Sequence, residues 1–166
     1  MKDHHLSQLL NEFKISTHKI FIETGTHLGN GIISALQIRH FEKIYSIELS
    51  EKYFNFCKNK FQNLQEVNII LGDSGVILGQ ILDSINSPCV FWLDGHFSAG
   101  DTACSDDYCS PIVKELEHIK NHKIKNHTII IDDMLDFTEK YINENWRVNK
   151  KCGYILREEL EKKILE

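Results

Sequence analysis

Apolar runs and helical patterns alternate along most of the chain. Short, nearly continuous apolar runs predict strands over residues 19–23, 43–48, 67–71, 88–94 and 127–132. Between these runs, apolar residues recur three or four positions apart, which predicts helices over residues 30–40, 51–61, 76–85 and 111–122. A further helix is predicted before the first strand, over residues 6–13. Ser50 is the expected N-cap of the helix that begins at Glu51.

The strands lack the polar alternation of a sheet that has one face in water. Strands that are apolar throughout are typical of a parallel sheet covered on both faces. We therefore predict an α/β fold, a Rossmann-like, doubly wound and mostly parallel sheet with helices on both faces and a compact C-terminal end. Residues 141–146 fit a short helix, residues 146–149 and 153–157 fit short strands, and residues 158–166 are charged. At 166 residues, the whole chain (1–166) is expected to form a single domain.

Composition narrows the function classes. Hydrophobic residues make up 42% and charged residues 26% of the chain, which is ordinary for a soluble globular protein. The net charge of -5 argues against a nucleic-acid partner, because phosphate binding needs clustered Lys and Arg. Neither a signal peptide nor an apolar run of the ~20 residues that span a membrane is present. We expect a cytoplasmic protein whose five cysteines are reduced thiols.

Acidic residues mark the ends of the predicted strands. Every strand ends in an acid or has one within two residues of its end, namely Glu23, Glu48, Asp73, Asp94 and Asp132. Helix capping explains one or two such acids, but not easily all five. Because ligands bind outside the carboxyl ends of the strands in a parallel sheet, these acids predict a functional edge.

The segment from Phe21 to Gly31 reads as a strand, a glycine turn and a helix start. Glycine lets a ligand approach bare backbone. The dinucleotide fingerprint requires glycine where this chain has His27 and Asn30, so NAD is disfavoured. Glu23 would repel a pyrophosphate but suits an ammonium group, which favours S-adenosylmethionine (SAM). Glu48, at the end of the second strand, suits the hydroxyls of a ribose.

Three segments together carry a family resemblance. Ile-Glu-Thr-Gly-Thr-His-Leu-Gly (22–29), Tyr-Ser-Ile-Glu (45–48) and Leu-Gly-Asp-Ser (71–74) resemble the successive cofactor motifs of class I SAM-dependent methyltransferases, over about residues 19–133. The resemblance implies that the glycine loop holds the methionine part of SAM, Glu48 the ribose, and Asp73 with Ser74 the adenine. The cofactor-binding residues that it implies are Glu23, Thr24, Gly25, Thr26, Gly29, Glu48, Leu49, Gly72, Asp73, Ser74 and Asp94. His27 replaces a small residue in many family loops and is expected to face solvent.

The fourth and fifth strands are expected to carry the reaction. If these strands are adjacent, Asp94, Asp132 and Asp133 converge, and a hard divalent ion such as Mg²⁺ would relieve their repulsion. This set resembles the metal site of catechol-type and macrocin-type O-methyltransferases, in which the metal lowers the pKa of the acceptor hydroxyl. Asp94 and His96 are the predicted catalytic residues, with His96 as the general base. Alternatively, Asp132 caps a helix and Asp133 is exposed, and methyl transfer needs no metal.

The polar loop over residues 97–110 is expected to be a lid for a polar, sugar-like acceptor. A less favoured interpretation is a zinc site formed by Cys104, Cys109 and His96, because a structural zinc site needs four ligands.

The prediction is therefore a methyltransferase that uses SAM and a metal to O-methylate a small polar molecule. The alternative is a non-catalytic, methyltransferase-like module that binds SAM or a nucleotide. The short region after Asp133 motivates this alternative, and it also allows a substrate side shared between the subunits of a homodimer.

Overall fold

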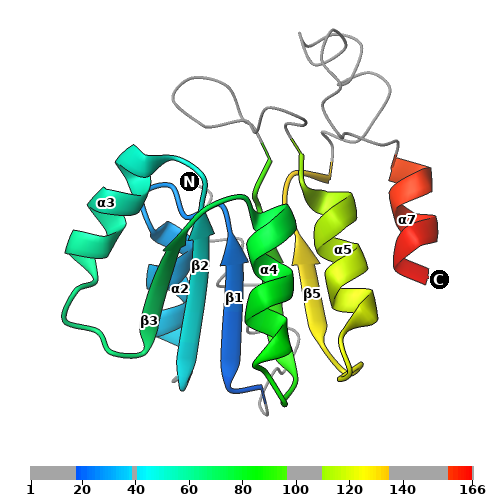
Figure 1. Ribbon diagram of the computed structural model, residues 1–166, viewed down its shortest axis with the longest axis horizontal. Coiled ribbons are helices and arrows are strands. Elements are labelled where there is room, and N and C mark those ends of the chain that lie inside the picture. Colours follow the sequence, from blue (N-terminus) through cyan, green and yellow to red (C-terminus); the bar gives the residue numbers. More distant parts are fainter. Residues whose placement is uncertain (1–17, 39–40, 97–109, 135–156, 166) are drawn as a thin grey trace, which may run out of the picture.

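The computed structural model describes residues 18–38, 41–96, 110–134 and 157–165, which form one parallel sheet flanked by helices (Figure 1). The strands are β1 (Ile20–Thr24), β2 (Lys43–Glu48), β3 (Val67–Leu71), β4 (Cys89–Leu93) and β5 (Thr128–Ile131). The helices are α2 (Asn30–Ile38), α3 (Glu51–Lys60), α4 (Ser74–Asp83), α5 (Ile112–Asn121) and α7 (Arg157–Leu165). Each strand pairs in parallel with its neighbours in the order β3-β2-β1-β4-β5.

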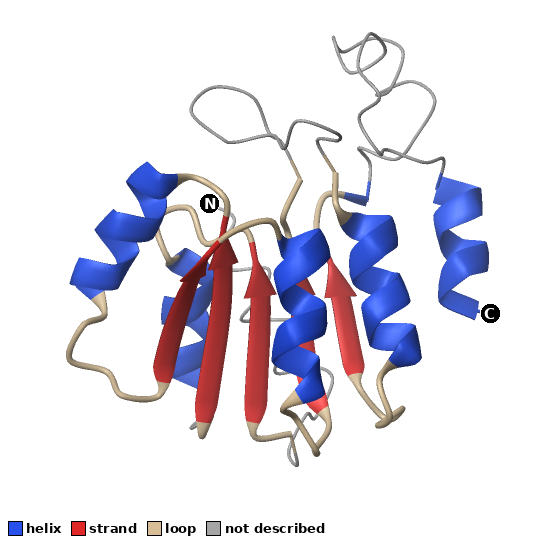
Figure 2. Ribbon diagram, viewed as in Figure 1, coloured by secondary structure: helices blue, strands red, loops and turns tan. Residues whose placement is uncertain are grey.

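The helices cover the sheet on both faces, as Figure 2 shows. Helices α2 and α3 pack on one face, where Ile32 and Phe61 join the core cluster of Phe21 and Val90. Helices α4, α5 and α7 pack on the other face, around a second cluster that includes Phe91. The continuous apolar character of the central strands β1 and β4 follows from this double burial, whereas the edge strand β3 is only partly buried.

The strand order reverses at β1, which pairs with β2 on one side and with β4 on the other. From β1 the chain winds outward through β2 to β3, and α4 then brings it back to β4. The loop that follows β1 therefore opens at the point where the two halves of the sheet diverge. Such a switch point is the usual ligand position in open α/β sheets.

Most of the predicted elements match the structure, and the differences have local causes. Helix α4 begins at Ser74 rather than Val76, because the Asp73 carboxylate caps it by accepting a 2.8 Å hydrogen bond from the Gly75 N–H. Ser50 occupies the N-cap position of α3 as predicted, but its side chain makes no capping hydrogen bond. Arg157 belongs to α7 and not to a strand.

Several predictions concern residues outside the described part of the chain: the helix over 6–13, the elements over 141–149 and 153–156, and the lid with Cys104 and Cys109. Among the described residues, Cys57 and Cys89 are free thiols. None of the described helices combines the length and apolarity that crossing a membrane requires.

Candidate functional site

The loop after β1 adopts a left-handed backbone at three positions, with φ of 82° at Gly25, 47° at His27 and 78° at Gly29. Gly25 is required by close packing, because a Cβ there would lie 2.2 Å from the carbonyl oxygen of Asp94. The N–H of Gly25 also donates to the carbonyl of Ile47 over 2.9 Å. The loop therefore lies directly against the ends of β2 and β4.

Helix α3 holds this loop from the outside. The Cys57 thiol donates to the carbonyl of His27 (3.2 Å), and the Lys60 ammonium donates to the carbonyl of Leu28 (2.7 Å). His27 is exposed, as expected, and its ring contacts that of Tyr53 at a centroid distance of 4.4 Å. The loop is thus positioned by contacts with α3 as well as by its own glycines.

Glu48 fastens the same loop from the end of β2. Its two carboxylate oxygens accept hydrogen bonds from the backbone N–H groups of His27 (2.7 Å) and Ser50 (2.8 Å). The residue is 6% exposed. Glu48, the residue predicted to bind the ribose, therefore also holds the loop in its conformation.

Glu23 lies beneath the loop and is 2% exposed. The Ser46 hydroxyl donates to its Oε2 over 2.5 Å, and Thr26 in turn bonds to Ser46 over 2.6 Å. Burial raises the pKa of Glu23 to about 8, helped by Asp94 and Glu48 and opposed by the Ser46 hydrogen bond. Glu23 is therefore mostly protonated at neutral pH, and a cation bound above it would favour its ionised form.

A pocket opens between the loop, the start of α2 and the ends of β4 and β5. It is lined by Glu23, Gly25, Thr26, His27, Leu28, Asn30, Gly31, Ser34, Trp92, Asp94 and Asp132. Asp132, a predicted metal ligand, thus faces the same pocket as four of the predicted cofactor residues. Acidic groups and bare backbone suit a ligand that carries positive charge.

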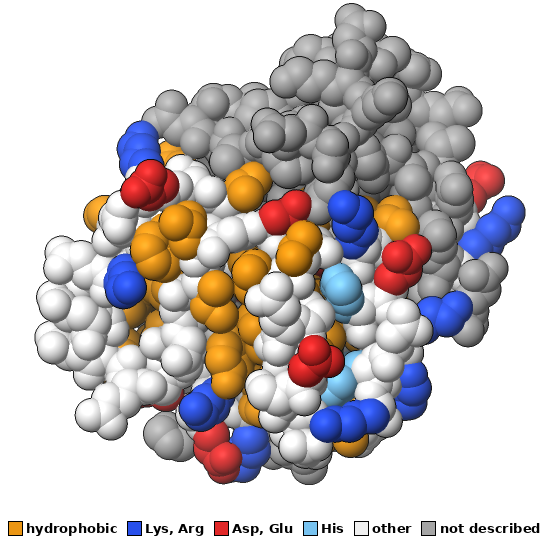
Figure 3. All heavy atoms as spheres, in the orientation of Figure 1, with side chains coloured by type: hydrophobic (Ala, Val, Ile, Leu, Met, Phe, Trp, Pro, Cys, Tyr) orange, Lys and Arg blue, Asp and Glu red, His pale blue; other side chains and the backbone are white. Residues whose placement is uncertain are grey.

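Of the other predicted cofactor residues, Thr24 ends β1 and Gly29 lies in the loop, while Glu48, Leu49, Gly72, Asp73 and Ser74 lie at or just after the ends of β2 and β3. Asp73 caps α4, and the Ser74 hydroxyl donates to Glu115 over 2.6 Å. Leu49, Leu71 and Val76 present apolar side chains that are 37%, 41% and 50% exposed. Figure 3 shows hydrophobic side chains gathered on this face between α3 and α4. Leu71 and Val76 were not among the predicted site residues.

Asp94, His96 and Asp133 come together at the ends of β4 and β5. Their potential ligand atoms all lie within 4.8 Å of one another. His96 is 8% exposed, with its Nδ1 3.5 Å from the Asp94 carboxylate and its Nε2 3.2 Å from that of Asp133. This mixed nitrogen and oxygen set has the donor chemistry for a divalent cation.

Asp132 and Asp133 take different roles at the end of β5. The Asp132 carboxylate accepts a 2.8 Å hydrogen bond from the Asp133 N–H, and Asp133 has a left-handed φ of 49°. Of the three predicted metal ligands, Asp94 and Asp133 lie close together, and His96 lies with them. Asp132 instead lines the pocket beside the loop. The metal site itself stays a prediction.

Glu115 was missed from the sequence. It is 1% exposed, and burial raises its pKa to about 7 against hydrogen bonds from Ser74 and Thr24. A signal was present, because Glu115 interrupts the stripe of buried apolar residues on α5 that includes Ile112 and Leu116. An acid in that stripe needs polar partners.

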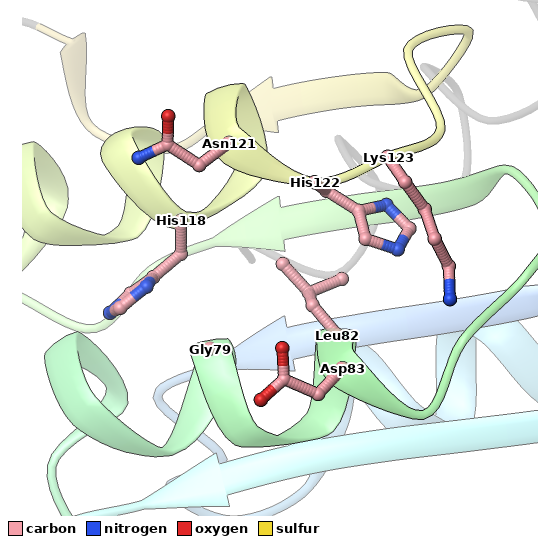
Figure 4. Close-up of a pocket in the computed structure, with 7 residues that line it drawn as sticks. All are labelled: Gly79, Leu82, Asp83, His118, Asn121, His122 and Lys123. Carbon is pink, nitrogen blue, oxygen red and sulfur yellow. The ribbon is translucent and has the colours of Figure 1, made fainter.

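A second hollow lies between α4 and α5, away from the strand ends (Figure 4). His118 donates to the carbonyl of Gly75 (2.9 Å), and His122 donates to that of Ile85 (3.0 Å). The other nitrogen of His122 lies 2.9 Å from His127, whose ring in turn accepts from the Cys89 N–H (3.0 Å). These rings hold backbone in place, so we assign this groove a structural role.

Comparison with known proteins found similar structures but no match in sequence. No family model matches the chain, and no curated protein matches it. A SAH-bound methyltransferase of Podospora anserina, PaMTH1, superposes with a TM-score of 0.61 at 13% identity, over 98% of this chain and 62% of its own length. Geranyl diphosphate methyltransferase in complex with SAM gives 0.60 at 12% identity, with coverage of 98% and 63%.

A Staphylococcus aureus protein described as a caffeoyl-CoA O-methyltransferase superposes with a TM-score of 0.55 at 14% identity, over 98% of this chain. The chain spans between 62% and 69% of the length of these three structures. Together with the parallel order of the strands, the superpositions confirm the predicted fold: the chain has the Rossmann-like fold of SAM-dependent methyltransferases.

Proposed function

We propose that this chain is a SAM-dependent methyltransferase that methylates a hydroxyl group of a small, polar, sugar-like acceptor. One observation carries the proposal: Asp94 lines the loop pocket and also belongs to the cluster with His96 and Asp133. A cationic cofactor in the pocket would therefore lie next to the groups that can activate an acceptor.

The charge of the pocket supports SAM as its ligand. The sulfonium and ammonium groups are positive, and Glu23, Asp94 and Asp132 line the pocket with acids. We assign Glu48, at the end of β2, to the ribose. The exposed apolar side chains of Leu49, Leu71 and Val76, beside Asp73, would cover a flat adenine.

His96 is the proposed general base. Held between the carboxylates of Asp94 and Asp133, its ring would take the proton of the acceptor hydroxyl. The two carboxylates would stabilise the imidazolium that forms. The acceptor oxygen then bonds to the methyl carbon as the carbon–sulfur bond breaks, and S-adenosylhomocysteine (SAH) leaves.

A divalent metal, Mg²⁺ in the first instance, is part of the proposal. Asp94 and Asp133 supply carboxylate oxygens of the kind that Mg²⁺ prefers, with Asp132 near them and His96 between them. When bound, the metal would act as a Lewis acid toward the acceptor hydroxyl. The alternative without a metal leaves the same proton transfer to His96 alone.

Thermal shift measurements with SAM, SAH and NAD, each with Mg²⁺ and with EDTA, test the cofactor and the metal. A ligand that binds the native state raises Tm, so SAM and SAH should stabilise the protein and NAD should not. Stabilisation by NAD alone would contradict the proposal. If methyl transfer persists in EDTA, the metal is not required, but the proposal of a methyltransferase still stands.

A non-catalytic module that binds SAM or a nucleotide is the second candidate. Incubation with SAM and a panel of sugars, catechols and other small hydroxyl compounds separates the two. SAM binding without SAH formation on any acceptor would favour the module.

A further inference from the structure

Glu115 meets three segments that the proposed function uses. Its Oε1 accepts a 2.6 Å hydrogen bond from the Ser74 hydroxyl, on the side predicted for adenine. It is also hydrogen-bonded to the side chain of Thr24, the last residue of β1. A Cβ on Gly95, between Asp94 and His96, would lie 3.1 Å from Glu115 Oε1.

Thr24 extends this connection to the reaction side. Its Oγ1 accepts a 3.2 Å hydrogen bond from the backbone N–H of Asp94, which leaves its own hydrogen for Glu115. His96 and Glu115 also line one small cavity together with Ser110. Within the described chain, the buried Oγ of Ser110 has no hydrogen-bond partner, although it lies in the same cavity wall as His96 and Glu115.

An acid at position 115 lowers the stability of the fold, most of all where its carboxyl group is not hydrogen-bonded. Glu115 is 1% exposed in the apolar stripe of α5, where Ile112, Leu116 and Ile119 pack into the core. Burying an acid costs free energy even when it is hydrogen-bonded, and an apolar residue would suit this stripe better. A buried acid that contacts two parts of a candidate site is therefore better explained by the site than by the core.

We propose that Glu115 is a positioning residue that fixes the Ser74 segment and the Asp94–His96 turn relative to each other. The inference rests on the proposed function, because it gives these segments the cofactor and the acceptor chemistry. Glu115 touches neither reactant. Its contribution is to keep the methyl group and the base in line, where small displacements reduce rates strongly.

Glu115→Leu and Glu115→Gln test the inference. Leucine removes the acceptor oxygens and leaves the buried Ser74 hydroxyl without its acceptor, so the variant should unfold at a somewhat lower temperature than the wild type but remain folded under assay conditions. We expect its kcat to fall at least about tenfold while the KM for SAM changes only a few-fold. Glutamine retains one acceptor oxygen and should recover most of kcat. Glu117→Leu, at an exposed position of the same helix, is the matched control and should change neither parameter.

Amide hydrogen exchange supplies a readout that does not depend on activity. In Glu115→Leu, exchange should be faster in residues 73–76 and 94–96 together and unchanged in α3. Wild-type exchange in both segments, or wild-type kcat in a folded Glu115→Leu, would overturn the inference. If the wild-type protein itself transfers no methyl group, the proposed function fails instead. The exchange pattern and the affinity for SAM then decide whether Glu115 links the two segments.

Discussion

The two halves of the carboxyl edge of the sheet are built differently. On the β1–β2 side, the carboxylates of Glu23 and Glu48 accept hydrogen bonds from a serine hydroxyl and from backbone N–H groups. On the β4–β5 side, the carboxylates of Asp94 and Asp133 face a histidine ring. The first arrangement fixes the shape of a loop, whereas the second brings together groups that can exchange protons. Under the proposed function, the β1–β2 side would bind the cofactor and the β4–β5 side would carry the reaction.

The largest effect that this comparison predicts is at His96. His96→Ala should lower kcat by about 10²- to 10⁴-fold, the usual contribution of a general base, while the dissociation constant for SAM changes only a few-fold. Steady-state kinetics and calorimetric titration with SAM measure the two quantities. Asn121→Ala, at an exposed position of the α4–α5 groove, is the control and should leave both unchanged. A kcat that withstands the loss of His96 would contradict the division between the two halves.

Glu48 should show the opposite pattern. Glu48→Ala leaves the N–H groups of His27 and Ser50 without their acceptor, so the loop should no longer hold the conformation described above. We expect SAM affinity to weaken about 10- to 100-fold, with kcat at saturating SAM largely retained. Glu51→Ala, at an exposed position at the start of α3, is the control for titration calorimetry. Equal losses in kcat and affinity would show that the halves are not separable.

Stability should depend on pH through the buried acids. The pKa of Glu23 is raised from 4.5 to about 8, so the native state holds a proton that the unfolded chain releases. Its contribution to stability is fully present below pH 4.5 and is lost as the pH rises through about 8. Glu115, with a pKa raised to about 7, acts in the same direction.

Urea unfolding at pH 5.5, 7 and 8.5 should therefore show a falling free energy of unfolding, and Glu23→Gln should flatten the slope. His127 opposes this trend at the acidic end. Its pKa is lowered from 6.5 to about 4 by burial and by His122, so its contribution is present above 6.5 and lost as pH falls through about 4. A slope unchanged in Glu23→Gln would show that Glu23 does not carry the effect.

The smallest effect is expected at the outer support of the loop. Lys60→Met removes the 2.7 Å hydrogen bond to the Leu28 carbonyl but keeps an extended apolar stem. Because a single hydrogen bond contributes about 0.5–1.5 kcal/mol, SAM affinity should weaken by about two- to tenfold. Lys58→Met on the same helix, whose ammonium lies over the Phe54 ring, is the control. Equal effects of the two substitutions would indicate lost surface charge rather than a lost support.

The sequence predicted the sheet well because each strand is a short apolar or β-branched run bounded by polar or glycine-containing turns. The runs over 43–48 and 67–71 match β2 and β3 residue for residue, although β3 is only partly buried. The position of the glycine loop followed from the same pattern. Helix α4 began earlier than predicted because the capping by Asp73 depends on a side-chain orientation.

The details of the site depend on contacts between distant residues. The sequence shows that Asp94, Asp132 and Asp133 lie at neighbouring strand ends. It does not show that the left-handed backbone at Asp133 separates it from Asp132 and directs it to His96. Likewise, the hydrogen bonds of Glu48 to the loop and of Ser74 to Glu115 join residues that are 21 and 41 positions apart. The roles assigned to these residues stay predictions.

The packing of Glu23 against Gly31 has a consequence for finding relatives of this chain. A Cβ at position 31 would lie 1.8 Å from Glu23 Oε1, so an alanine there would require the Glu23 carboxylate to shift. A chain with alanine at 31 would need a shorter residue at 23, and Gly31→Ala should be tolerated better together with Glu23→Asp. Where overall identity falls to 12–14%, we expect the residue types at positions 23 and 31 to vary together, and an alignment of relatives would test this.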